Sequence, residues 1–147
     1  MPSRAQIAEA ARAYLGVRWR HCGRDRQNGL DCVGLLLAVS ADVGYAEAAS
    51  FDPGSYSRRP DGVTLTSILR NSLVPVQEVR EGSVVAFWID AADRPTHVAI
   101  VGKHPRIEGE FSLIHSHAKV RQVVEVTFDA YWRSRVAEAF AFPGTRD

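Results

Sequence analysis

The hydrophobic pattern of the chain changes near Pro75, and this change constrains the fold more than any other feature of the sequence. Before Pro75, apolar residues recur at the three- to four-residue spacing of helices, whereas after it they form short continuous or alternating runs typical of strands. Helices followed by a row of neighbouring strands predict an α+β fold, with N-terminal helices packed on an antiparallel sheet. A length of 147 residues without internal repeats predicts a single domain over residues 1–147.

Three helices are expected in the first half of the chain. Ser3 and Gln6 have the spacing of a capping box that starts the first helix, and Gly16 is its expected end. The second helix is expected over about 32–43, and a turn-rich connection at 45–63 precedes a short third helix. The residues expected to face the core from these helices are Ile7, Ala8, Ala11, Leu15, Leu35, Leu36, Val39, Leu65, Ile68, Leu69 and Leu73.

Four strands are expected after the change, and the last segment is expected to hold one helical turn and a closing strand. The run "GSVVAFWI" is continuously apolar, which predicts a strand buried on both faces. The other strand candidates are "THVAIVG", "FSLIHSH" and "VVEVTF", and the closing segment is "DAYWRSRVAEAFAFP".

Composition excludes several classes of protein. A net charge of +1 gives no electrostatic reason to expect nucleic acid or an acidic membrane surface as a partner. No apolar run approaches the ~20 residues that cross a bilayer, so membrane insertion is not expected. Two cysteines do not form a disulfide framework in a chain of this size.

Cys32 lies where the second helix is expected to begin, after a polar loop at 18–30. The N-terminus of a helix carries partial positive charge and free N–H groups, which lower the pKa of a thiol placed there. Asp31 is a candidate N-cap, and Gly29 and Gly34 would allow another part of the backbone to approach. Cys32 is therefore a candidate nucleophile. The alternative is an ordinary buried cysteine that acts as a small apolar residue.

A nucleophilic thiol needs a base, and the base needs a group that orients it. His97 begins one predicted strand, while His115 and His117 lie on the same face of the next because the side chains of a strand alternate. Neighbouring strands would bring His97 and His115 side by side. The alternative for each is a histidine with a purely structural role.

The same residue types also bind zinc, but their spacing does not favour it. Zinc ligands usually come in closely spaced pairs, whereas Cys22 and Cys32 are ten residues apart and His115 and His117 alternate along a strand. No metal site and no cofactor are therefore expected.

The sequence resembles the NlpC-type cell-wall cysteine peptidases from about Ile7 to Gly144. The segment "LGVRWRHCGRDRQNGLDCVGLLLAVS" is similar to the family's opening motif, which ends in D-C-[SV]-G at a helix start. "THVAIVG" resembles its H-V-G-I strand and "LIHSHAKV" its I-H-A segment, while "YWRSRVAEAFAFPG" resembles its closing W-x-x-R segment and final strand. The order of cysteine before histidine is that of papain-like enzymes. The resemblance therefore implies a papain-like fold.

The resemblance also implies roles for individual residues. Cys32 would be the nucleophile, His97 the base and His115 the third polar residue. Asp31 would bind the free amine of a substrate peptide, and Trp19 and Arg20 would complete the substrate site, although Trp19 stands where the family usually has tyrosine.

Two further loop features leave alternatives open. The arginines of the loop either meet the carboxylates of a peptide substrate or form an ordinary solvated basic surface. Cys22 is expected to be a spare loop thiol, with a second nucleophile as the alternative, and a disulfide between Cys22 and Cys32 would inactivate the site.

The function implied is a peptidoglycan endopeptidase that cleaves an amide bond of the stem peptide, between D-γ-glutamate and a diamino acid. The "IHSH" and "AFAFP" details resemble the branch found in phage tails and gene-transfer particles. The start "MPSRAQIAEAARAYLG" has no apolar signal core, so we expect synthesis in the cytoplasm and delivery to the periplasmic wall on such a tail, docked to tail or baseplate proteins. The alternative is a structural tail-assembly protein that keeps the fold with little activity.

Overall fold

The computed structural model describes residues 2–45, 52–54, 63–89 and 95–146. Helices α1 (Arg4–Arg12), α2 (Cys32–Asp42) and α3 (Val63–Ser72) come first, and a short two-stranded hairpin of β1 (Arg24–Asp25) and β2 (Gly29–Leu30) precedes α2. The remaining elements are β3 (Val74–Val76), β4 (Val84–Phe87), β5 (His97–Lys103), β6 (Phe111–His117), β7 (Gln122–Thr127), α4 (Ala130–Arg133) and β8 (Val136–Ala141).

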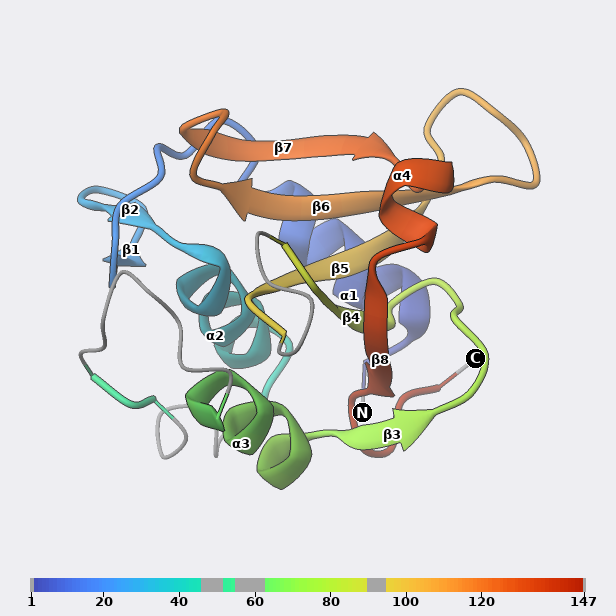
Figure 1. Cartoon of the computed structure of the whole chain (residues 1–147), viewed down its shortest axis with the longest axis horizontal. Helices are drawn as coiled ribbons and strands as arrows, with labels where there is room; N and C mark the ends of the chain where they lie inside the picture. The colour runs from blue at the N-terminus through green and yellow to red at the C-terminus, as the bar shows by residue number, and fades with distance from the viewer. Residues whose placement is uncertain (1, 46–51, 55–62, 90–94, 147) are drawn as a thin grey trace.

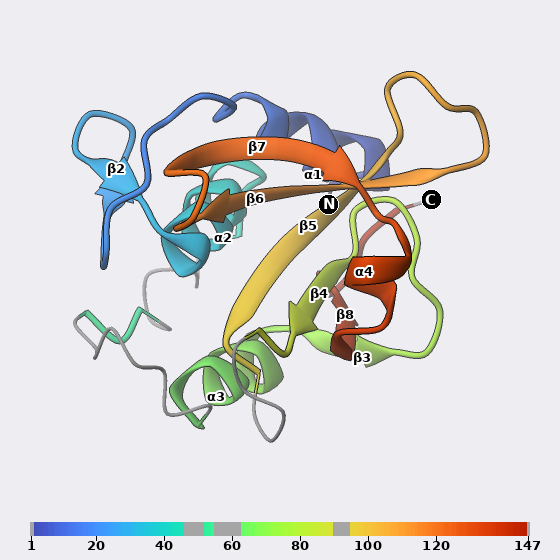
Figure 2. The ribbon, with the colours of Figure 1, turned by 45° about the horizontal axis from the view of Figure 1, so that its top comes forward.

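The main sheet has six strands in the order β3-β8-β4-β5-β6-β7, and every neighbouring pair is antiparallel. Helices α1 and α2 lie on one side of this sheet and α4 on the other (Figures 1 and 2). The predicted α+β architecture, with helices packed on an antiparallel sheet, is confirmed.

The strand β4 shows how the sheet is buried. Val84 and Ala86 pack into the core beneath α1, α2 and α3, while Val85 and Phe87 pack into a second core on the opposite face. All four residues are buried, as the continuous apolar run predicts. The sheet is therefore covered on both faces at β4.

The start of α1 forms as predicted, but its end does not. Ser3 accepts a hydrogen bond from the Gln6 N–H, and the Gln6 side chain accepts one from the Ser3 N–H, which completes the capping box. The helix ends at Arg12, and a turn follows in which Gly16 has a positive φ and donates to the Val123 carbonyl. Leu15 lies on this turn and is 43% exposed, so its predicted core position is wrong. The other predicted core residues of the helices are buried.

Three short strands lie where none was predicted. The hairpin of β1 and β2 forms inside the expected polar loop, and β3 pairs with β8 at the edge of the main sheet. Pro75, which has no N–H to donate, is tolerated in β3 because that strand is an edge strand. Most of the predicted turn-rich connection at 45–63 lies outside the described residues. None of the described helices combines the length and the apolar character that crossing a membrane requires.

Candidate active site

Three histidines cluster on β5 and β6. The two strands pair with Ile100 opposite Ile114, which places His97, His115 and His117 on the same face of the sheet. The Nε2 atom of His97 lies 2.6 Å from Nδ1 of His115, and both side chains are buried. The ring of His117 lies 5.5 Å from that of His97 and 5.2 Å from that of His115, measured between centroids. The predicted proximity of His97 and His115 is confirmed.

This hydrogen bond assigns the nitrogen atoms of His97. Its Nε2 is taken by His115, so Nδ1 is the atom with which His97 can accept a proton from a thiol. Burial, followed by the charges that His115 and His117 would carry, lowers the pKa of His97 well below its usual 6.5. Burial and His117 lower the pKa of His115 to about 3. Both imidazoles are therefore neutral at neutral pH, and in the hydrogen bond between them one ring donates its N–H to the bare nitrogen of the other.

Cys32 is the first residue of α2, as predicted, and its thiol lies beside the backbone of Val98, the residue that follows His97 in β5. The backbone N–H groups of Val98, Val33 and Cys32 itself all favour the thiolate. Burial and the charge of Asp31 outweigh them and raise the pKa of the thiol to about 12. The prediction that Cys32 has a lowered pKa is wrong for this structure, because burial of the sulfur costs more than the helix N-terminus returns.

Asp31 fixes the start of α2 and the loop before it. Its Oδ1 accepts hydrogen bonds from the Gly34 N–H at 2.8 Å and from Nη1 of Arg24 at 3.1 Å, and its Oδ2 accepts one from the Cys22 N–H at 2.8 Å. The residue is only 5% exposed. These bonds make Asp31 the N-cap of the helix, as predicted. Its role in binding a substrate amine stays a prediction.

The close approach expected at Gly34 is present. A Cβ atom at this position would lie 2.0 Å from the carbonyl oxygen of Gly23, so only glycine lets the loop rest directly on the first turn of α2. A Cβ at Gly23 would in turn lie 2.2 Å from the Gly29 carbonyl oxygen. The glycines of this region therefore hold the segments around Cys32 in backbone-to-backbone contact.

Trp19 and Arg20 lie beside β2, the short strand that leads to Cys32. The Arg20 N–H donates to the Leu30 carbonyl at 3.2 Å, and Trp19 forms a bridge with Leu30 while donating to the Arg121 carbonyl. The same Leu30 carbonyl accepts from the Ser116 hydroxyl, between the two histidines of β6. This places Trp19 and Arg20 beside the candidate site. Their contact with a substrate stays a prediction.

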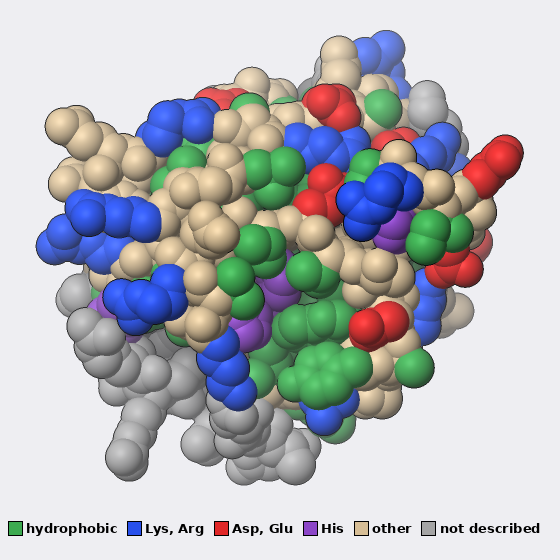
Figure 3. Space-filling view, turned by 90° about the horizontal axis from the view of Figure 1, so that it is seen from above, with side chains coloured by type: hydrophobic (Ala, Val, Ile, Leu, Met, Phe, Trp, Pro, Cys, Tyr) green, Lys and Arg blue, Asp and Glu red, His purple; other side chains and the backbone are tan. Residues whose placement is uncertain are grey.

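Trp132 of α4 is a site residue that the sequence did not point to. Its ring makes an edge contact with His115 at 5.1 Å and lies within 6.0 Å of His97 and 5.9 Å of His117. The half-buried indole therefore covers the histidine cluster on the side of the sheet where α4 lies. In Figure 3 histidine side chains are visible near the centre of the face, with hydrophobic side chains on one side and basic ones on the other. Only the fold brings α4 to this position.

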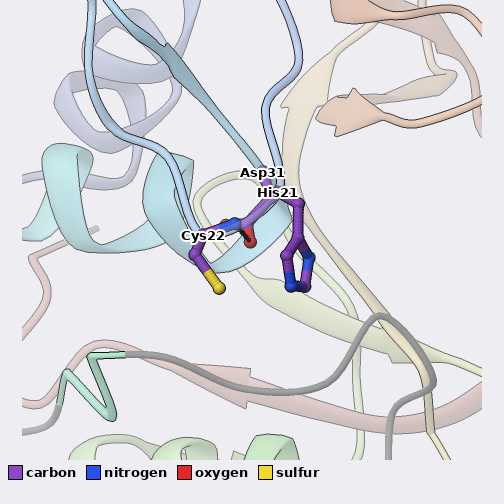
Figure 4. Close-up of side chains that lie close together, drawn as sticks. All are labelled: His21, Cys22 and Asp31. Atoms are coloured by element: carbon purple, nitrogen blue, oxygen red, sulfur yellow. Dashed lines mark hydrogen bonds between the residues drawn. The ribbon is translucent and has the colours of Figure 1, made fainter.

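A second group with metal-binding side chains lies in the loop before α2. His21, Cys22 and Asp31 each place a donor atom within 4.8 Å of the others (Figure 4). The spacing of residues in the sequence did not indicate this group, because Asp31 joins it through the folding of the loop.

The fold has clear relatives among solved structures. No family profile matches the sequence, and a search among curated proteins found no match. The chain is similar to an NlpC/P60 family protein from Bacillus cereus, with a TM-score of 0.65, 20% identity and 96% of this chain covered. It is also similar to the NlpC/p60 domain of the peptidoglycan hydrolase SagA, with a TM-score of 0.61, 21% identity, and coverage of 95% of this chain and 99% of that domain.

A third similar structure is a lipoprotein-like NLP/P60 family protein from Staphylococcus aureus, with a TM-score of 0.59, 19% identity and 95% of this chain covered. The chain spans 41% of the length of the Staphylococcus aureus protein and 40% of that of the Bacillus cereus protein. The chain therefore has the NlpC/P60 fold, in which helices pack on an antiparallel sheet.

Proposed function

We propose that this protein is a cysteine peptidase that cleaves an amide bond in the stem peptide of peptidoglycan, with Cys32 as nucleophile, His97 as base and His115 as the residue that orients His97. The observation that carries the proposal is the 2.6 Å hydrogen bond between the two buried imidazoles, on strands beside the first turn of the helix that starts at Cys32. The likeness to a domain from a peptidoglycan hydrolase supports the choice of substrate.

The reaction begins from a neutral thiol and a neutral imidazole. As the Cys32 sulfur bonds to the carbonyl carbon, its proton passes to Nδ1 of His97. The carbonyl oxygen becomes an oxyanion, which the backbone N–H of Cys32 stabilises. The His97 imidazolium then protonates the leaving amine as the C–N bond breaks. Water hydrolyses the resulting thioester and restores the thiol.

His115 controls the orientation and tautomer of His97. When His97 is protonated, its Nε2–H donates to Nδ1 of His115, so His115 carries its own proton on Nε2. Because both rings are buried, the imidazolium is costly and exists only while the negative charge of the reaction balances it. His115 therefore acts on catalysis through His97.

The bond proposed to be cleaved joins D-γ-glutamate to a diamino acid. Among the loop arginines, Arg18 donates to the Asn28 carbonyl, Arg24 binds Asp31 and Asp52, and Arg26 donates to the Ala13 carbonyl. Arg20 is exposed and its backbone pairs with Leu30 beside the site. Of the four, Arg20 is therefore the one we assign to a carboxylate of the stem peptide.

We also propose that the enzyme rides on a phage-like or gene-transfer-particle tail and acts on the periplasmic wall. The likeness of "IHSH" and "AFAFP" to that branch of the family supports this. Purified particles from producing cells should contain the protein bound to tail or baseplate components. If the protein is recovered only as a free species, the proposal of delivery on a tail is rejected, while the proposed peptidase activity is unaffected.

The activity is tested by digesting purified peptidoglycan and identifying the released muropeptides by mass spectrometry. Wild-type protein should give products with a new D-γ-glutamyl carboxyl end, and Cys32→Ser should give none. Cys22→Ser is the matched control, since it removes the other thiol and should retain activity. A wild-type protein that is present in purified tails but inactive would favour the structural tail-assembly role. An active Cys32→Ser variant would overturn the assignment of Cys32 as the nucleophile.

A further inference from the structure

We propose that His21, Cys22 and Asp31 form a binding site for a Zn²⁺ ion in the loop that precedes the candidate nucleophile. The three side chains offer an imidazole nitrogen, a sulfur and a carboxylate oxygen, all within 4.8 Å of one another (Figure 4). The proposed catalytic residues Cys32, His97 and His115 contribute no donor atom to this site, and of its three donors only Asp31 also has a predicted role in the peptidase, the binding of a substrate amine.

The geometry is close to what zinc requires. Zinc bonds of 2.0–2.3 Å in a tetrahedral arrangement separate neighbouring ligand atoms by about 3.5 Å. The donor atoms lie at most 4.8 Å apart, so each separation has to shrink by no more than about 1.3 Å, a change within the range of side-chain rotation at His21 and Cys22. His21 and Cys22 are half-buried in a turn, so their side chains are accessible from solvent. Three protein ligands leave a fourth position for water.

The third ligand is already held in place. Asp31 is buried, and its Oδ1 accepts from the Gly34 N–H and from Arg24, while Oδ2 faces Cys22 and accepts from its N–H. Carboxylates that bind metals are commonly oriented by such hydrogen bonds from a second layer of residues. Asp31 therefore provides a rigid ligand, and the two loop residues close on it.

The mixture of donors selects the ion. Magnesium and calcium prefer sites made of oxygen atoms, whereas imidazole and thiolate suit zinc. When the S–Zn bond forms, Cys22 gives up its proton to solvent, so one proton is released for each ion bound. The thiolate and the carboxylate together balance the two charges of the ion. Because Asp31 directly precedes Cys32 in the sequence, one zinc ligand would be the residue next to the candidate nucleophile.

The test is a metal titration of the full chain under reducing conditions. Zn²⁺ affinity is measured by competition with a chromophoric chelator, and Co²⁺ is used as a spectroscopic probe because a thiolate ligand gives it a charge-transfer band. Wild-type protein should bind one ion and show this band. Cys22→Ser should abolish the band, and both Cys22→Ser and His21→Asn should weaken Zn²⁺ binding by more than about 100-fold, since losing even an outer partner costs about 10- to 100-fold.

The controls separate this site from the catalytic group. Cys32→Ser and His115→Gln should bind Zn²⁺ as tightly as the wild type and keep the cobalt band. Thermal unfolding of each variant confirms that it is folded. The proposal is overturned if wild-type protein binds no ion, or if binding depends on Cys32 or His115 and not on Cys22 and His21.

Discussion

The two halves of the candidate site are held in place by different means. His97 and His115 lie on neighbouring strands of the central sheet, where the antiparallel pairing puts them on one face and their rings form a hydrogen bond. Cys32 is placed by a loop and a helix cap, and both depend on the carboxylate of Asp31. Many backbone hydrogen bonds hold the sheet, whereas in the loop a single side chain, that of Asp31, makes the bonds to the cap and to the turn, beside the close backbone contacts of the glycines. Mutations in the histidine half should therefore lower the rate of catalysis, whereas mutations in the cysteine half should lower the stability of the fold.

The largest effect is expected within the histidine half. His115→Ala should lower the turnover of muropeptides by about 10³-fold, because His97 loses the partner that fixes its tautomer. His117→Ala should lower it by less than about 10-fold, since His117 neighbours both rings while Nε2 of His97 is bonded to His115. Steady-state kinetics of the two variants measures the difference. Equal losses, or the reverse ranking, would contradict the assignment of His115.

The next effect tests the cysteine half. Asp31→Ala should lower the free energy of unfolding by about 4 kcal/mol, because it removes the cap of α2 and leaves Arg24 without one of its two carboxylates. Denaturant titration measures this change.

Asp25→Ala is the matched control for Asp31. Asp25 is also a loop carboxylate with bonds to Asn28, but it is exposed, and its replacement should change the free energy of unfolding by less than about 1 kcal/mol. Similar losses in the two variants would show that the loop has no dominant anchor.

The buried imidazoles should make stability depend on pH. The pKa values of His97 and His115 are lower in the folded protein than the usual 6.5, so the unfolded state binds protons more readily. The contribution of both rings is fully present above pH 6.5 and is lost as the pH falls below it, for His115 down to a pKa of about 3. For His115 alone, the free energy of unfolding should fall by roughly 3 kcal/mol between pH 7 and pH 4.

Urea titrations at several pH values measure this slope, and His115→Gln is the comparison. The variant should have a flatter dependence on pH than the wild type, because it lacks one of the two titrating rings. The same slope in both proteins would mean that His115 does not contribute to the dependence.

The smallest effect concerns Trp132, which joins α4 to the histidine half. Trp132→Ala should destabilise the protein by about 2 kcal/mol, since a half-buried indole loses its contacts with His115 and Phe87. Trp132→Phe should restore most of that loss, because an aromatic ring still covers the histidines. Thermal unfolding of both variants makes the comparison, and an unchanged Trp132→Ala protein would show that the cover adds nothing.

The sequence by itself determined the elements and several local features. Periodicity predicted the three N-terminal helices and the strands β4 to β8, the Ser3–Gln6 box started α1, and Asp31 capped α2. Each of these depends on residues within a few positions of one another, so the local pattern is sufficient. The candidates Cys32, His97 and His115 were also found in the sequence, because a helix start and two alternating strands are local patterns.

Tertiary structure decided everything that depends on distant residues. The pKa of Cys32 is raised because the fold buries the sulfur, although its position at a helix start predicted the opposite direction. Trp132 reaches the histidines only through the path of the chain from β7 into α4, and Leu15 is exposed because a turn at Arg12 ends its helix early. His21, Cys22 and Asp31 meet because the loop folds back on α2. Burial, long-range pairing and the meeting of loop residues are set by the whole fold, since no local pattern encodes what will pack against a side chain.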